Sequence, residues 1–189
     1  MDKKTLNYIF DERKAAEAAA FLLSLNNSRL PYLKLIKLLY ISDRISLSEY
    51  HSSITTDAYV SMKLGPVTSG ILDRIKHSAD YSDKGPWNSI IRTDGYDVSL
   101  KHDFVPCFLS EEEMDVLRYV NNRYGKYEKF DLAELTHMFP EWQDPGNSSI
   151  PIQIEDILFA TIDDDEKRNQ AAEDIMLSAH LHNISYRDM

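Results

Sequence analysis

The 189-residue chain has a single cysteine, Cys107, and no long run of apolar residues. One cysteine excludes an internal disulfide and a zinc site built from several cysteines. Cys107 stands between Pro106 and Phe108 in an apolar patch, so we expect it to be buried rather than reactive. No apolar stretch approaches the roughly 20 residues of a membrane-spanning helix, and the Lys-rich start leads into no signal-peptide core. A reducing cytoplasm is therefore the expected location.

The sequence also lacks the usual catalytic signatures. It has no His-Glu-x-x-His motif and no nucleophile elbow, and Gly65 and Gly70 do not have the spacing of a phosphate-binding loop. The acidic run 163–166 lacks the alternating ligands, the glycine and the distal glutamate of a calcium loop, so we expect it to cap the helix that follows. We predict no catalytic residues, no metal site and no cofactor. The enzyme alternative is a small metal-dependent hydrolase or nuclease that uses this run.

Acidic residues are concentrated in the second part of the chain. Residues 1–80 hold 11 Lys and Arg against 9 Asp and Glu, a balance of +2, whereas residues 81–189 hold 10 against 22, a balance of −12. Proteins that bind nucleic acids use basic patches to neutralise phosphates, so this charge argues against that partner. It favours association with a basic protein surface. The alternative is that the charge serves solubility alone.

Helical periodicity is clear in the first fifty residues. Asp11 can cap a helix from about Glu12 to Leu25, whose alanine-rich face indicates close approach to another helix. A second helix is predicted from about Pro31 to Tyr50, with Lys34 and Lys37 away from its apolar face.

Two segments favour β-structure. Tyr59–Leu64 is a short extended run that stops at Gly65, and we expect Pro66 to open a helix because its missing N–H has no partner at the first helical position. The pair Asp94-Gly95 lies between two β-prone runs and predicts a hairpin within residues 89–100.

The rest of the chain again predicts helices. Ser110 and Glu113 form a capping box. Further helices are expected near residues 66–77, 131–139, 154–160 and 165–182, the last two in an acidic helical part over residues 150–189. We predict a mainly α fold: one α-helical domain over residues 1–189, with six or seven helices and a small β-hairpin or strand element.

Four short motifs occur in a fixed order within residues 10–77, and a weaker likeness continues to about residue 142. Together they resemble the Panacea domain of the SocA-like antitoxins. The motifs are Lys14-Ala15-Ala16-Glu17-Ala18-Ala19, Leu39-Tyr40-Ile41-Ser42-Asp43-Arg44, Asp57-Ala58-Tyr59-Val60 and Gly65-Pro66-Val67.

The resemblance implies a function in protein binding. Proteins of this family resemble antitoxins that bind and block a toxin encoded beside them, in bacteria, phages and mobile elements. It implies a cytoplasmic antitoxin that binds its cognate protein toxin, without a cofactor and without a membrane. The acidic second part of the chain favours a toxin with a basic surface. One branch of the family implies the alternative of an adaptor that delivers its toxin to an ATP-dependent protease; a transcriptional regulator is a lesser alternative.

The candidate protein-binding residues follow from the same motifs. Arg and Tyr commonly dominate the energetics of interfaces. The alternative is structural: the charged pair within an apolar helix forms an ion pair or hydrogen-bond network with the Asp57–Tyr59 segment. The candidates are Tyr40, Asp43, Arg44, Asp57, Tyr59, Lys63, Gly65, Pro66 and Thr68.

Overall fold

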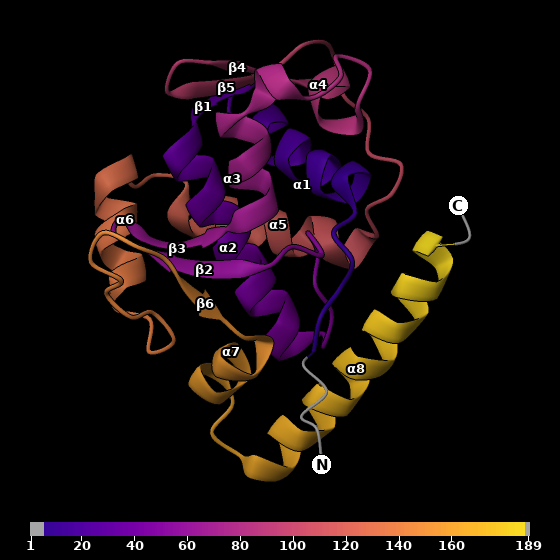
Figure 1. Cartoon of the computed structure of the whole chain (residues 1–189), viewed down its shortest axis with the longest axis vertical. Helices are drawn as coiled ribbons and strands as arrows, with labels where there is room; N and C mark the ends of the chain where they lie inside the picture. The colour runs from indigo at the N-terminus through magenta and orange to yellow at the C-terminus, as the bar shows by residue number, and fades with distance from the viewer. Residues whose placement is uncertain (1–5, 188–189) are drawn as a thin grey trace.

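The computed structural model describes residues 6–187 as a mixture of helices and short strands (Figure 1). The helices within these residues are α1 Glu12–Ser24, α2 Tyr32–Glu49, α3 Ser69–Lys76, α4 Pro86–Ile90, α5 Glu111–Tyr124, α6 Lys129–His137, α7 Ile154–Thr161 and α8 Asp165–Arg187, with one 3-10 turn, η1 Ser78–Asp80. The strands are β1 Arg29–Pro31, β2 Tyr59–Met62, β3 Gly65–Thr68, β4 Ile91–Asp94, β5 Asp97–Leu100 and β6 Ile150–Ile152. No helix among these residues is both long and apolar enough to cross a membrane.

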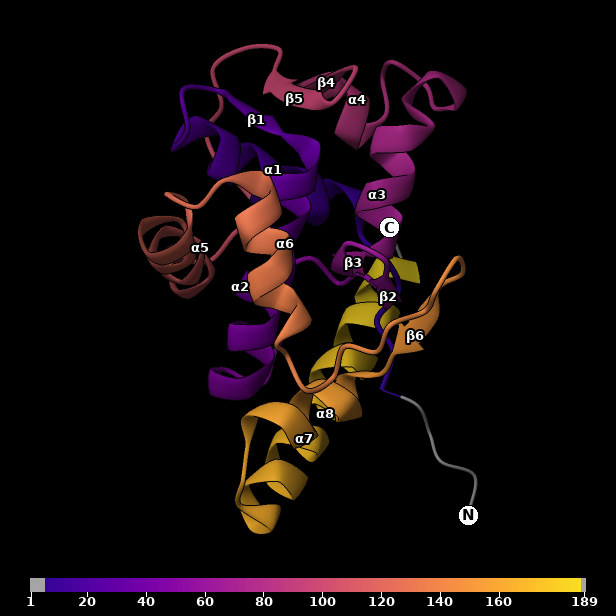
Figure 2. The same cartoon turned by 90° about the vertical axis from the view of Figure 1, so that its left-hand side faces the viewer.

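Helix α2 lies in the middle of the molecule and contacts α1, α5, α6 and α7 (Figure 2). Its residues are therefore buried on several sides rather than along one stripe, and Leu35, Leu38 and Leu39 are all 0% exposed. Helix α1 contributes five buried alanines to the same core, which allows close approach to its neighbours.

The strands form two antiparallel sheets of three strands each, in the orders β1-β5-β4 and β3-β2-β6. Three of the four edge strands contain a proline: Pro31 in β1, Pro66 in β3 and Pro151 in β6. A proline has no N–H for a ladder, so it is tolerated at the edge of a sheet and discourages pairing with a further strand.

The prediction of a mainly α fold with six or seven helices and one small β-element is wrong. The described residues contain eight α-helices and two three-stranded sheets, a mixed α and β fold. Strands of three or four residues are too short to display the alternation that marks a strand in a sequence. Pro66 belongs to β3, where it pairs with Ser61, and α3 begins three residues later. The single-domain assignment stays a prediction.

Most of the buried apolar residues in the described part of the chain form two clusters. The larger one joins α1, α2 and α5 to the first sheet and includes Trp87. The smaller one joins α2 to β6, α7 and α8, through residues such as Tyr40, Tyr59 and Ile157. Helices α7 and α8 lie at the opposite end of the molecule from β4 and β5 (Figure 1). Tyr40 and Tyr59, both motif residues, thus lie where the acidic C-terminal helices pack on α2.

Candidate functional site

Asp43 binds the loop that follows α2. Its side chain is buried, and its Oδ1 accepts hydrogen bonds from the backbone N–H groups of Ile54 at 2.7 Å and Thr55 at 3.0 Å and from the Ser53 hydroxyl at 3.3 Å. Its Oδ2 accepts the hydroxyl of Thr55. Burial raises the pKa of Asp43, and these donors oppose the shift. The carboxylate thereby fixes the course of residues 53–55.

Tyr40 and Arg44 converge on one buried carboxylate. Glu141 Oε1 accepts the Tyr40 hydroxyl at 2.9 Å and the Arg44 Nε–H at 2.7 Å, and the Glu141 side chain is 0% exposed. The Arg44 guanidinium also lies over the Phe139 ring, 4.3 Å from its centre. Burial, followed by the nearby Glu141 charge, raises the pKa of Tyr40. Sequence reasoning missed Glu141, which lies nearly one hundred residues away along the chain.

Asp57 caps α3 from outside the helix. Its carboxylate accepts the N–H groups of Gly70 at 2.7 Å and Ile71 at 2.9 Å, and that of Ala58 at 2.7 Å. Burial raises the pKa of Asp57 to about 6, against the opposing effect of these N–H groups. A cap at the first turn satisfies helix donors that have no partner within the helix. Asp57 therefore fixes the start of α3, and its carboxylate does not bind Arg44.

Tyr59 completes the connection between α2 and the loop. Its hydroxyl lies 3.1 Å from the Ser53 hydroxyl, and its ring meets that of Tyr40 edge to face at 5.7 Å between centres. Burial raises the pKa of Tyr59. The motifs Leu39–Arg44 and Asp57–Val60 thus come together in the interior through the Ser53 hydroxyl and the Tyr40–Tyr59 ring contact, whereas Arg44 pairs with Glu141.

Lys37 is the unexpected member of this region. Its side chain is 0% exposed, although the helical pattern placed it away from the apolar face. Its Nζ donates a hydrogen bond to the carbonyl of Pro66 at 2.6 Å, and no carboxylate within residues 6–187 forms an ion pair with it. Burial lowers the pKa of Lys37 to about 7. We call Lys37, Tyr40, Asp43 and Arg44 the α2 polar cluster.

The β2–β3 turn packs against Lys37, the first member of this cluster. Gly65 has φ +92°, a conformation that favours glycine, and it packs against Lys37 and Thr136. Lys63 and Leu64 form the exposed tip of the turn. Of the candidate residues, Lys63 alone is exposed and Arg44 is half-buried, whereas the others are buried: Tyr40, Asp43, Asp57, Tyr59, Gly65, Pro66 and Thr68.

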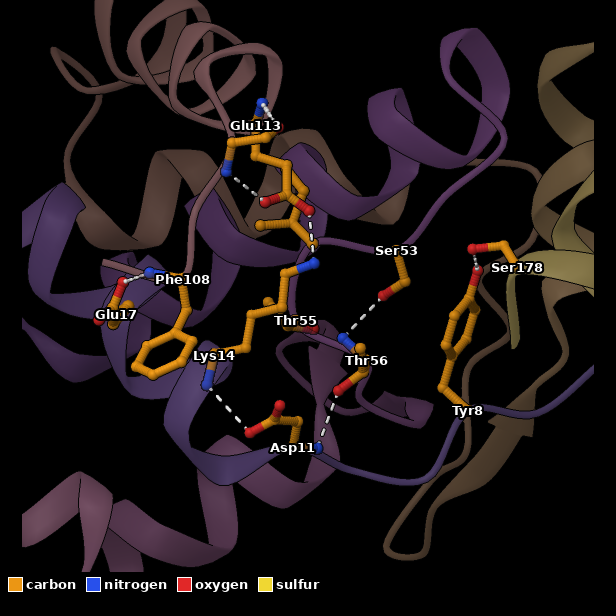
Figure 3. Close-up of polar contacts among 12 residues, drawn as sticks. Tyr8, Asp11, Lys14, Glu17, Ser53, Thr55, Thr56, Phe108, Glu113 and Ser178 are labelled. Carbon is orange, nitrogen blue, oxygen red and sulfur yellow. Dashed lines mark hydrogen bonds and ion pairs between the residues drawn. The ribbon is translucent and has the colours of Figure 1, made fainter. Parts of the chain in front are cut away.

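The N-terminal end of α1 also binds the loop of residues 53–57, which follows α2 (Figure 3). The N–H of Asp11 donates to the Thr56 hydroxyl at 2.9 Å, and the N–H of Thr56 donates to the Ser53 hydroxyl at 2.8 Å. Lys14 forms an ion pair with Glu113 at 2.6 Å, which joins α1 to the start of α5. The segment before α2 and the loop after it are therefore held together by side-chain contacts.

Glu17 holds the segment that contains Cys107. The buried Glu17 carboxylate accepts the N–H groups of Cys107 at 2.8 Å and Phe108 at 2.7 Å. Cys107 is exposed, so the prediction of a buried cysteine is wrong. Its apolar neighbours lie in a surface segment, which the local sequence did not distinguish from a core segment.

The acidic run at the start of α8 does not assemble a metal site. Asp164 accepts the N–H of Lys167 at 2.9 Å, which confirms the predicted capping role, and Asp165 pairs with Arg168. Within the described part of the chain, no three His, Cys, Asp or Glu side chains lie close enough to hold one metal ion.

Comparison with known families adds one match. Residues 35–143 match the family model described as "Antitoxin SocA-like, Panacea domain", and this segment contains the whole α2 polar cluster and Glu141. The family indicated by the sequence motifs is thereby confirmed over these residues. Neither the curated proteins nor the solved structures provide a significant match to the chain.

Proposed function

The chain belongs to the SocA-like antitoxin family with the Panacea domain, and on this basis we propose that it neutralises a co-encoded protein toxin by binding it directly. The family match, which spans residues 35–143, is the observation that carries the proposal. Neutralisation is stoichiometric: the bound protein covers the toxin's active surface or holds the toxin in an inactive shape. The proposed setting is the cytoplasm, and the proposed mechanism uses neither a cofactor nor bond-making chemistry.

We propose two roles for the candidate binding residues. The buried members of the α2 polar cluster act indirectly, because their polar atoms are engaged by groups of the same chain, as with the four donors on Asp43. They hold the 53–57 loop and the β2–β3 turn in place. Lys63 lies exposed on that turn and is the candidate residue that we propose contacts the toxin directly. This division follows from burial, since a side chain inside the fold contributes to binding by positioning its neighbours.

The test begins in the source genome. Each gene beside the one that encodes this chain is expressed alone and then together with it, and growth is measured. We expect one neighbour to stop growth alone and to be tolerated in the pair, and its product to co-purify with this protein. If no neighbour is toxic and no protein co-purifies, the proposal fails.

The protease-adaptor alternative predicts a different requirement. Direct inhibition works with purified toxin and purified antitoxin, whereas an adaptor removes toxin only when an ATP-dependent protease and ATP are present. Measuring the activity of the purified toxin with and without this protein, in the absence of any protease, separates the two. Inhibition in that mixture supports direct neutralisation.

A further inference from the structure

Helix α8 is held to the rest of the protein along one face. Ala171, Ile175 and Ala179 are buried on that face, at the spacing of successive helical turns. Figure 3 shows one of its polar attachments, the hydroxyl of Tyr8 donating to that of Ser178 at 3.2 Å. These contacts fix which side of the helix faces outward.

A second set of attachments holds the C-terminal half of the helix. The N–H of Ile9 donates to Asn183 Oδ1 at 2.7 Å, and the His182 ring lies 2.9 Å from the Ile9 carbonyl. The segment before α1 is thus bound to α8 over two helical turns. Because both halves of α8 are attached, the side of the helix that faces outward is held in place, and Figure 1 shows the helix along one edge of the molecule.

The outer face carries a row of large apolar side chains. Leu177, Leu181 and Ile184 are 60%, 59% and 47% exposed and lie four and three residues apart, on one side of the helix. Met176, 45% exposed, borders the row. Single exposed leucines are normal, but a contiguous apolar row on a rigid helix is the usual mark of an interaction surface.

The side of α8 that carries this apolar row is acidic in the N-terminal half of the helix. Glu166 and Glu173 precede Leu177 by eleven and four residues, so they lie on the same side of the helix as the apolar row, closer to its N-terminus. Residues 154–187, which comprise α7, α8 and the link between them, include eight acidic and three basic residues. Two such surfaces repel each other, which disfavours a second copy of this chain as the occupant, whereas a basic surface is attracted.

A groove of about 470 Å³ runs along this side of α8, between Leu6 and the helix. Glu173, Met176 and Leu177 line it together with Asn7, His180 and Asn183, so it borders the apolar row on one side and combines apolar and polar walls with a carboxylate at one end. A helix with an apolar stripe and flanking Lys or Arg fits a surface of this kind, because its apolar side chains enter the groove while its cations meet the acidic half.

We propose that the outer face of α8, formed by Glu173, Leu177, Leu181 and Ile184, binds a basic amphipathic helix of the toxin. This inference rests on the proposed function and names the surface that performs it. Helix α8 lies outside the segment that matches the family, residues 35–143. The proposed contact therefore lies outside the part of the chain that matches the family model.

The direct test uses the full chain and a synthetic amphipathic peptide of leucine and lysine as the probe. The variant combines Leu177→Ser and Leu181→Ser, and the matched control is Met138→Ser, which removes an 82% exposed side chain on a different element. We expect the double variant to bind the probe at least about tenfold more weakly than the wild type by calorimetry, and the control to bind unchanged. Circular dichroism and thermal melting confirm that all three proteins are folded.

A second peptide, with glutamate in place of every lysine, tests the charge argument and should not bind. Equal affinity of the Leu/Lys peptide for the wild type and the double variant would overturn the proposal. So would a dimer in sedimentation equilibrium that the double variant dissociates, because the face would then bind a second copy.

The growth assay separates this inference from the function on which it rests. If the wild type rescues growth and the double variant does not, both stand. If the double variant rescues as well as the wild type does, α8 is not the toxin-binding surface, although the antitoxin function stands. If no neighbouring gene is toxic, the function fails, and the peptide titration still decides whether this face binds a basic helix.

Discussion

Asp43 accepts both the backbone N–H and the side-chain hydroxyl of Thr55, one at each oxygen of its carboxylate. These two hydrogen bonds join α2 to the loop of residues 53–57, which the N–H of Asp11 at the start of α1 also contacts. The loop leads directly to Asp57, which caps α3, so one carboxylate on α2 influences the placement of two other helices.

Replacing this carboxylate should be among the most destabilising single changes. Asp43→Ala leaves the N–H groups of Ile54 and Thr55 and the Thr55 hydroxyl buried without a partner, and we expect a loss of at least about 3 kcal/mol. Asp43→Asn keeps an acceptor of the same shape and should lose about 1 kcal/mol. Urea denaturation monitored by circular dichroism measures both values. Losses well below about 1 kcal/mol in both variants would show that the hydrogen bonds contribute little.

Lys37 should make stability depend on pH. An unfolded lysine has its ordinary pKa of 10.5, whereas burial lowers the pKa of Lys37 to about 7 in the folded protein. Between these values the unfolded chain binds a proton that the folded chain does not, so this residue makes the free energy of unfolding rise with pH. Below the folded pKa both states are protonated, and the full cost of burying the charge is present.

Lys37→Met removes that cost. We expect the substitution to stabilise the protein by roughly 4 kcal/mol more at about pH 6 than at about pH 10, because each pKa unit corresponds to about 1.4 kcal/mol. The matched control is Lys34→Met on the same helix, where the side chain is half-exposed and the gain should not vary in this way. Urea denaturation of the three proteins at both pH values provides the comparison. A gain that is the same at both would contradict the prediction.

Gly65 and Gly95 make a matched pair for testing the β2–β3 turn. Both have positive φ, +92° and +59°, but a Cβ on Gly65 would overlap the Thr136 hydroxyl, whereas no atom of residues 6–187 outside 94–96 lies within 4 Å of one on Gly95. We expect Gly65→Ala to cost about 3 kcal/mol or more and Gly95→Ala about 1 kcal/mol, the backbone contribution alone. Thermal unfolding followed by calorimetry measures the difference. Similar costs would indicate that Thr136 moves aside freely.

Local signals in the sequence predicted the elements that local interactions determine. The capping box at Ser110 and Glu113 begins α5 as expected, and the Asp94-Gly95 pair lies in the hairpin between β4 and β5. The helices over residues 12–24 and 32–49 have the predicted bounds to within a residue or two. In each case, capping, periodicity or turn chemistry acts among neighbours in the chain.

What the sequence did not predict depends on distant residues. Ile150–Ile152 becomes β6 because β2 lies beside it, and Pro66 becomes part of a strand for the same reason. Lys37 is buried because β3 and α6 pack on the polar side of α2, which a helical pattern in one segment cannot reveal. The motifs identified the family, whereas the buried carboxylate that binds Tyr40 and Arg44 could be found only from the folded structure.

The pair formed by Arg44 and Glu141 should show strong energetic coupling. Either single change, Arg44→Met or Glu141→Met, leaves a charged group in a largely buried place without its counterion, and each should cost about 3 kcal/mol. The double variant should cost less than the sum, which gives a coupling energy of roughly 2 kcal/mol. The matched control is the exposed pair of Arg118 and Asp115, 2.6 Å apart against 2.7 Å for the buried pair, and its coupling should stay below about 0.5 kcal/mol. Urea denaturation of the two double-mutant cycles makes the comparison. If the two coupling energies are equal, Arg44 does not stabilise the buried Glu141 carboxylate. The contact between α2 and the segment after α6 would then be maintained by apolar packing around Phe139.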